Sequence, residues 1–107
     1  MSGNTKNKYG VNILEKDVEQ YLKRQCTKFG MLCFKFNSPG KVGVPDRIII
    51  FAGMVFFVEC KAPAGKITPN QVSVHMEMLK QGVTVSIVRT FAEVDNLLSV
   101  IKSIANA

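Results

Sequence analysis

Two short apolar runs separated by a single glycine constrain this chain more than any other feature. Residues 48–52 and 54–58 are rich in β-branched and aromatic side chains, and Gly53 lies between them. Runs of this length and composition around one turn residue predict two buried strands joined by a tight turn. Asp46 precedes the first run and Glu59 ends the second. The antiparallel pairing of such a hairpin therefore places two carboxylates side by side.

The residues that follow the hairpin suggest why two acids would be gathered there. Side chains alternate along a strand, so Glu59 and Lys61 point to one face and Cys60 to the other. Two adjacent carboxylates repel, and burying either charge costs several kcal/mol. A divalent cation relieves both problems, and carboxylate oxygens suit Mg²⁺ or Mn²⁺. The sequence thus predicts a Mg²⁺ or Mn²⁺ site, with Lys61 directed at an attacking water or a phosphate.

Pro45-Asp46, twelve further residues and then Glu59-Cys60-Lys61 resemble the PD-(D/E)xK nuclease signature. The surrounding residues are similar to one branch of it, the VRR-NUC (virus-type replication-repair nuclease) family, stand-alone phage or bacterial type. The segments that carry this similarity are 37–47 and 57–66, with Glu15, Gln71 and Gly82, so it covers roughly residues 13–98.

The resemblance implies a restriction-endonuclease-like fold and a metal-dependent DNA endonuclease. Its catalytic residues would be Glu15, Asp46, Glu59, Lys61 and Gln71. Its metal would be held by Asp46, Glu59, the Cys60 carbonyl and Glu15. The implied substrate is branched DNA, four-way junctions or flaps, cut during replication, repair or recombination by a homodimer. The alternative is a DNA-binding module of the same fold that does not cut, or that depends on a partner.

The elements expected along the chain follow the order αβββαβα. A helix over 12–29 precedes a strand at 31–36, a turn-rich loop at 37–45 and the hairpin. A helix then begins after Thr68, a strand covers 83–88, and a last helix starts at Phe91. The helix between the third and fourth strands makes a crossover, so those strands should be parallel. We expect an α/β fold: an αβββαβ core whose mixed sheet is flanked by helices, plus the C-terminal helix. Residues 1–10 are expected to form a flexible basic N-terminus, and 11–107 a single domain.

An acid on the apolar face of the first helix needs an explanation. At 100° per residue, Glu15 falls between Leu22 and Cys26 on the apolar arc, whereas Glu19 lies at its edge. We expect Glu15 to turn toward Asp46 and Glu59. The alternative is that the Glu15 carboxylate reaches solvent, in which case Glu19 is the acid of this helix expected at the site.

The helix after Thr68 offers two interpretations of one glutamine. Gln71 occupies the third position of a capping box, which is a purely structural role. The family resemblance instead assigns a glutamine here to the active site, and the two roles are compatible. His75, the only histidine, lies on the same flank and is expected to be a boundary residue. Val72, Met76 and Leu79 form the stripe expected to be buried.

The net charge of +6 favours an anionic partner such as nucleic acid. Near the signature, the basic side chains expected to contact DNA are Lys35, Lys41, Arg47 and Lys66; the alternative is an ordinary solvated basic surface. Three cysteines without zinc-ligand spacing suit small core residues in a reducing cytosol, so we expect a cytoplasmic protein of a bacterium or phage-infected cell.

Several classes of function find no support in the sequence. No apolar run approaches the roughly 20 residues that a membrane span needs. Gly65-Lys66 lacks the remainder of a Walker A motif and no GxGxxG is present, so no nucleotide cofactor is expected. The apolar face of the last helix is expected to be mostly core, with a dimer surface as an alternative use.

Overall fold

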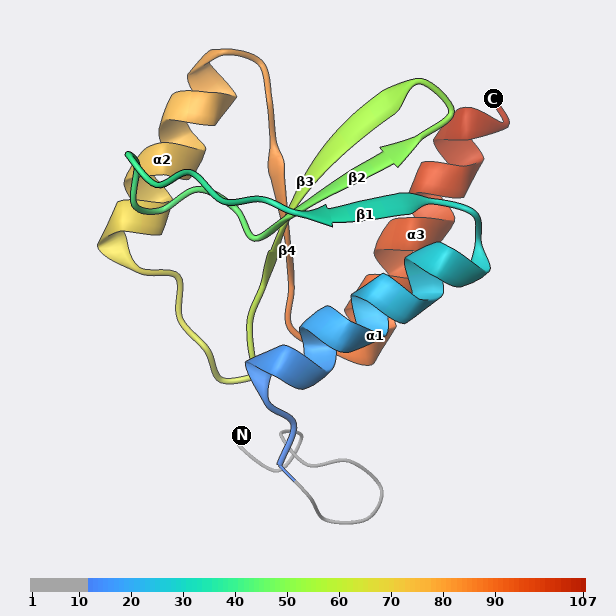
Figure 1. Ribbon diagram of the computed structural model, residues 1–107, viewed down its shortest axis with the longest axis horizontal. Helices are drawn as coiled ribbons and strands as arrows, with labels where there is room; N and C mark the ends of the chain where they lie inside the picture. Colours follow the sequence, from blue (N-terminus) through green and yellow to red (C-terminus); the bar gives the residue numbers. More distant parts are fainter. Residues whose placement is uncertain (1–11) are drawn as a thin grey trace.

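The structure, a computed structural model, describes residues 12–107, and the predicted N-terminal segment 1–10 lies outside the described residues (Figure 1). Its elements are α1 (Glu15–Lys28), β1 (Leu32–Lys35), β2 (Arg47–Phe51), β3 (Met54–Cys60), α2 (Pro69–Lys80), β4 (Val85–Val88) and α3 (Phe91–Ala105). This is the predicted order αβββαβα. The first helix begins three residues later than predicted because Leu14 is its N-cap.

The four strands form one mixed sheet in the order β1-β2-β3-β4. The first two pairings are antiparallel, and β3 pairs with β4 in parallel, as the crossover predicts. The β2–β3 hairpin turns at Ala52 and Gly53, both at positive φ, and Phe51 lies opposite Met54. This register fixes which residues at the far end of the hairpin face each other.

One face of the sheet, which we call the closed face, packs against α1 and α3. Figure 1 shows these two helices side by side under the sheet, and they contact each other. The fully buried core residues come from α1, the closed face and α3: Val18, Leu22, Cys26, Ile49, Val58, Cys60, Val94, Leu98 and Ile101. The core role expected of Cys26 and Cys60 is confirmed, and Cys33 packs against the same cluster.

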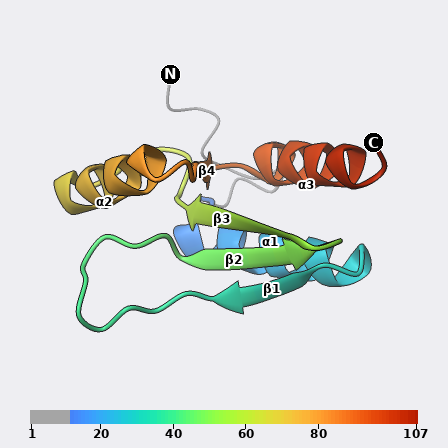
Figure 2. The same cartoon turned by 90° about the horizontal axis from the view of Figure 1, so that it is seen from above.

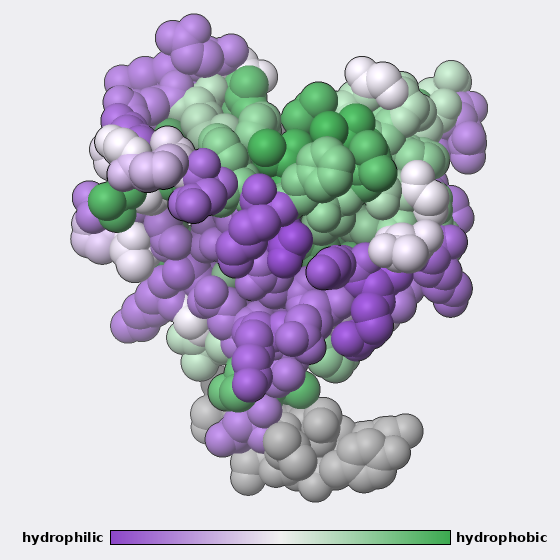
Figure 3. All heavy atoms as spheres, in the orientation of Figure 1, coloured by the Kyte–Doolittle hydropathy of each residue, from purple (hydrophilic) through white to green (hydrophobic). Residues whose placement is uncertain are grey.

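The opposite face of the three antiparallel strands carries apolar side chains with much less cover. The strand register aligns two rows on it, so that this open face consists of Leu32, Phe34, Ile48, Ile50, Val55 and Phe57. Leu32, Phe34 and Val55 are each more than half exposed. In Figure 3 hydrophobic residues line the notch between α2 and the β2–β3 hairpin.

Helices α2 and α3 lie on opposite sides of β4, as Figure 2 shows. The predicted buried stripe of Val72, Met76 and Leu79 is wrong, because each of these side chains is about half exposed. The buried residue of α2 is Val74. An added Cβ on Gly43 would lie 3.0 Å from the Val74 Cγ2 atom, so this side of α2 packs against the loop before β2.

The last helix confirms the expectation that its apolar face is mostly core, because Val94, Leu98 and Ile101 are fully buried. Val100 and Ile104 of α3 stay about half exposed. Across residues 12–107, the helices are all too short or too polar to cross a bilayer.

Candidate active site beside the β2–β3 hairpin

The hairpin places Asp46 and Glu59 next to each other. Arg47 pairs with Val58, so the residue before β2 lies beside the second-last residue of β3. Asp46 is partly buried, and its Oδ2 atom accepts a hydrogen bond of 2.9 Å from the Cys60 backbone N–H. Glu59 is 1% exposed. The two carboxylates predicted from the sequence therefore meet at one end of the sheet.

The environment of Glu59 disfavours its negative charge. Burial, the charge of Asp46 and a hydrogen bond with Asp46 together raise the pKa of Glu59 to about 8, against a smaller opposing effect of Lys61. A carboxyl group of this kind keeps its proton at neutral pH unless a positive charge is added. The pair thus has the electrostatics of a cation site.

Lys61 lies on the same face as Glu59, as the strand alternation predicts. Its Nζ atom is 3.9 Å from the Glu59 Oε2 atom, and its side chain is 10% exposed. The backbone N–H of Lys61 donates to the Val88 carbonyl at 3.0 Å, which extends the β3–β4 pairing by one residue. The ammonium group is therefore held beside the Glu59 carboxylate.

Gln71 forms the predicted capping box and also contacts Glu59. Its backbone N–H donates to the Thr68 hydroxyl, and its side-chain Oε1 accepts from the Thr68 N–H, which completes the capping box. The remaining Nε2 group donates to the Glu59 Oε2 atom at 3.0 Å. The start of α2 is thereby tied directly to the acidic pair.

His75 also reaches Glu59, although the sequence marked it only as a boundary residue. Its Nε2 atom lies 3.9 Å from the Glu59 Oε1 atom, and its side chain is 13% exposed. Burial lowers the pKa of His75, and the nearby Asp46 only partly offsets this. The imidazole is therefore neutral at neutral pH.

The loop before β2 is fitted closely against α2. Gly43 has φ +105, and a Cβ at this position would come within 2.5 Å of the Asn70 carbonyl oxygen. Only glycine combines this conformation with so close an approach. The loop that leads to Asp46 and the first turn of α2 therefore form one packed unit.

The expected burial of Glu15 is wrong. It is the first residue of α1, where the helix extends past the core, and its side chain is exposed. It remains near enough to add a small repulsive contribution to the raised pKa of Glu59. Within residues 12–107, no three His, Cys, Asp or Glu side chains converge as cation ligands, so Glu15 does not complete a three-acid cluster.

Glu19, the alternative acid of α1, has a different role. Its Oε2 atom accepts hydrogen bonds of 2.9 Å from both Lys35 Nζ and Arg47 Nε. Burial alone would raise the pKa of Glu19, but the two hydrogen bonds outweigh it and lower the pKa. Glu19 is thus an ionised bridge between α1 and the sheet.

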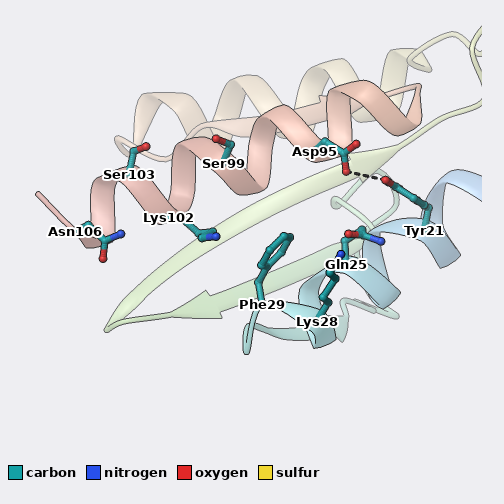
Figure 4. A pocket seen from close by; sticks show the side chains of 9 residues that line it. All are labelled: Tyr21, Gln25, Lys28, Phe29, Asp95, Ser99, Lys102, Ser103 and Asn106. Carbon is teal, nitrogen blue, oxygen red and sulfur yellow. Dashed lines mark hydrogen bonds between the residues drawn. The ribbon is translucent and has the colours of Figure 1, made fainter.

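A wide hollow lies between α1 and α3, away from the acidic pair (Figure 4). Its volume is about 530 Å³, and its lining residues are Tyr21, Gln25, Lys28, Phe29, Asp95, Ser99, Lys102, Ser103 and Asn106. The Tyr21 hydroxyl donates to Asp95 at 2.7 Å, and the Lys102 ammonium lies 4.3 Å from the centre of the Phe29 ring. These contacts are typical of a helix–helix boundary.

Known proteins resemble this chain in both sequence and fold. A protein of Acyrthosiphon pisum secondary endosymbiont phage 1, provisionally named nuclease p44, is 42% identical over 71 residues, which is 65% of this chain and 76% of the phage protein. A solved structure described as a VRR_NUC domain superposes with a TM-score of 0.72 at 33% identity. It covers 79% of this chain, and this chain covers 94% of it. The chain belongs to the VRR-NUC family. No family model matches the sequence.

In this VRR-NUC domain the residues expected to contact DNA differ in their availability. Lys66 is exposed on the loop after β3, and Lys41 is half exposed with an ion pair to Glu77 at 3.0 Å. Lys35 is 61% exposed although it bonds Glu19. The side chain of Arg47 is only 13% exposed and is bonded to Glu19, so direct contact of Arg47 with DNA is not supported.

Two contributions to the site were missed from the sequence of this VRR-NUC domain. The Cys60 N–H that holds Asp46 is a backbone group, so no residue pattern marks it. His75 did leave a signal, because it follows Gln71 by one helical turn and shares its face. That spacing predicts that any group Gln71 contacts is also within reach of His75.

Proposed function

We propose that this chain is a Mg²⁺- or Mn²⁺-dependent endonuclease that cuts branched DNA as a homodimer. The observation that carries the proposal is the pairing of the partly buried Asp46 with the buried Glu59, beside Lys61. Membership of the VRR-NUC family supports nuclease activity, and the phage relative is provisionally named a nuclease.

The donor set fits a hard divalent cation. The Glu59 Oε1 atom is buried and has no hydrogen-bond partner among the described residues. A buried carboxylate with a free oxygen beside a second carboxylate is a typical ligand arrangement for Mg²⁺, which completes its shell with water and phosphate. Asp46 and Glu59 would hold the ion, and the Cys60 carbonyl remains a proposed third ligand. When bound, the ion makes water more acidic and offsets charge on a phosphate.

Other residues of the chain would orient the two carboxylates and stabilise charge on the phosphate. The Cys60 N–H and the Gln71 amide orient Asp46 and Glu59, respectively. Lys61 places its ammonium group where it can orient a water or stabilise the charge that develops on phosphorus. The acidic Glu15 at the start of α1 has a weaker supporting role, because it is exposed. No covalent enzyme intermediate is required.

DNA contact is proposed for the basic residues around this site. Lys41 and Lys66 lie on the loops before β2 and after β3, so both loops border the acidic pair. Contacts to phosphate position a duplex without reading its sequence. Selection of branched DNA would then depend on its shape and on the geometry of two linked sites.

The homodimer is proposed to form through the open face of the sheet. The half-exposed apolar residues there are of the kind that interfaces between identical subunits bury. Two copies that each carry a net charge of +6 repel least across a surface without charged side chains. Glu59 continues the same face of β3, so such a dimer would bring two sites near one another.

The deciding experiment is cleavage of labelled four-way junction, flap, duplex and single-stranded DNA with Mg²⁺ or Mn²⁺. Asp46→Asn and Glu59→Gln should lower the rate at least ~100-fold while DNA binding persists. Asp95→Asn is the matched control, because Asp95 bonds Tyr21 away from the site.

Equal activity of wild type and Asp46→Asn would refute the site. Tight binding to DNA without cutting by the wild type, at any metal concentration, would instead favour the non-catalytic or partner-dependent binding module. Cutting of duplex DNA at the same rate as junctions would remove the branched-substrate part of the proposal.

A further inference from the structure

The two oxygen atoms of Glu59 face two different residues of α2. Gln71 Nε2 donates to Oε2 at 3.0 Å, whereas His75 Nε2 lies 3.9 Å from Oε1. Gln71 and His75 are four residues apart and therefore lie on the same face of the helix. One face of α2 therefore lies next to both oxygen atoms of the buried Glu59 carboxylate.

The contact between His75 and Glu59 is incomplete. Glu59 Oε1 and His75 Nε2 are both buried, and neither has a hydrogen-bond partner among the described residues. A buried polar atom without a partner costs about 1–3 kcal/mol, so such atoms are rarely left unsatisfied. A separation of 3.9 Å is too long for a direct hydrogen bond. Both atoms expose almost no surface to water, so the gap has no room for a bridging molecule; it would close to a hydrogen bond if the two side chains moved about 1 Å closer.

We propose that His75 is a positioning residue of the cation site, which holds Glu59 Oε1 when the ion is bound, as Gln71 holds Oε2. This inference rests on the proposed binding of a cation by Asp46 and Glu59. Each carboxylate oxygen accepts two bonds, so the contacts to α2 leave acceptor capacity for an ion. Partners of this kind orient a ligand, and their loss typically weakens metal binding ~10–100-fold.

The position of α2 makes such a role possible. Its first turn is fixed by the capping box at Thr68 and by the close approach of Gly43 to Asn70. Glu59 is fixed by its place in β3, between two paired strands. His75 and Glu59 therefore belong to two well-anchored elements, so only their side chains need to move for the contact to close.

A different role for His75 is to fill space. It lines the apolar groove of about 310 Å³ between α2 and β4, together with Met76, Leu79 and Ile87. A space-filling role needs only volume, so leucine would serve as well as histidine. A positioning role needs a polar atom, and glutamine can place its amide near the position of Nε2.

The first test is calorimetric titration of the full chain with Mn²⁺ in the absence of DNA. His75→Leu should weaken Mn²⁺ binding ~10–100-fold, and His75→Gln should recover most of this loss. Met76→Leu, a neighbour in the same groove, is the control and should bind Mn²⁺ like the wild type.

The second test needs no substitution at position 75. His75 is the only histidine, so the untagged wild-type protein gives a single set of imidazole ¹⁵N resonances. Saturating Mg²⁺ should shift the Nε2 resonance, and Glu59→Gln should abolish this shift. The measurement remains decisive if His75→Leu does not fold.

The outcomes separate the two proposals. Two results would overturn the role of His75 alone. One is a Mn²⁺ affinity that is unchanged in His75→Leu. The other is an Nε2 resonance that does not shift although calorimetry shows that Mg²⁺ binds. Failure of the wild type to bind either ion would refute the cation site itself, and the role of His75 with it.

Discussion

The closed and open faces of the sheet are built from the same kinds of residue but differ in how far they are buried. Ile49 on the closed face is fully buried under α1 and α3, whereas Val55 on the open face is 55% exposed. Both faces are apolar over the hairpin. Only the open face continues into Glu59 and Lys61, and there α2 covers it.

This difference separates stability from function within one sheet. The closed face meets two helices, and the core cluster that holds the domain together lies between them. The open face supplies the acidic pair and the uncovered apolar surface that we propose a second copy covers. Substitutions on the two faces should therefore have distinct consequences, which the following predictions measure.

The largest difference in stability is expected between two adjacent isoleucines of β2. Ile49→Ala should lower the free energy of unfolding by about 2–5 kcal/mol, because it opens a cavity in the core. Ile50→Ala, on the open face, should cost only about 1 kcal/mol. Urea unfolding of both variants, at a concentration that keeps the chain monomeric, measures the contrast. Equal losses would mean that the open face is as well packed as the closed one.

A second effect on stability is expected from pH on the metal-free protein. The pKa of Glu59 is raised from 4.5 to about 8, so the folded state holds a proton that the unfolded chain has already lost. The contribution of Glu59 to the free energy of unfolding should therefore be most favourable below pH 4.5 and should decline as the pH rises to about 8. Each pKa unit corresponds to about 1.4 kcal/mol, so the shift of Glu59 sets an upper limit of about 5 kcal/mol on this decline.

Glu59→Gln supplies the control for this pH dependence, because an amide does not titrate. Thermal melts at several pH values in EDTA should show a flatter profile for the variant than for the wild type. Added Mg²⁺ should stabilise the wild type most at high pH, where the proton no longer competes. A wild-type profile that rises from pH 5 to 8 in step with the variant's would contradict the assignment.

The smallest effect on monomer stability is expected from charges placed on exposed apolar positions. Val55→Lys on the open face and Val100→Lys on α3 form a matched pair, with exposures of 55% and 46%. Each should change the free energy of unfolding by less than about 0.5 kcal/mol. In sedimentation velocity, Val55→Lys should dissociate the dimer and Val100→Lys should not. The reverse pattern would move the interface to α3, and a monomeric wild type would refute the dimer.

The sequence predicted the hairpin and its consequences because alternation and turn residues are local signals. The pairing of Asp46 with Glu59, the direction of Lys61 and the parallel β3–β4 pair all followed from them. The same local reasoning failed for Val72 and Met76. Helical periodicity finds an apolar stripe, but it does not reveal whether the fold supplies anything to cover that stripe.

The charged residues show a second limit of sequence reasoning. Arg47 was expected to meet DNA, yet strand alternation places it on the closed face, where it bonds Glu19. Glu15 was expected to be buried, but α1 begins at that residue and the core does not extend so far. Both residues lie at the ends of elements, where the exposure and partners of a side chain depend on tertiary packing.

The close contact of Gly43 with Asn70 has a consequence for how this domain tolerates sequence change. A mutation that adds a side chain at Gly43 would push apart the loop that ends in Asp46 and the helix that carries Gln71 and His75. The core cluster between the sheet, α1 and α3 includes no residue of this loop or of α2, so the molecule would keep its shape while its acidic pair lost its supports. Selection for folding alone would let such variants accumulate; only selection for activity would remove them.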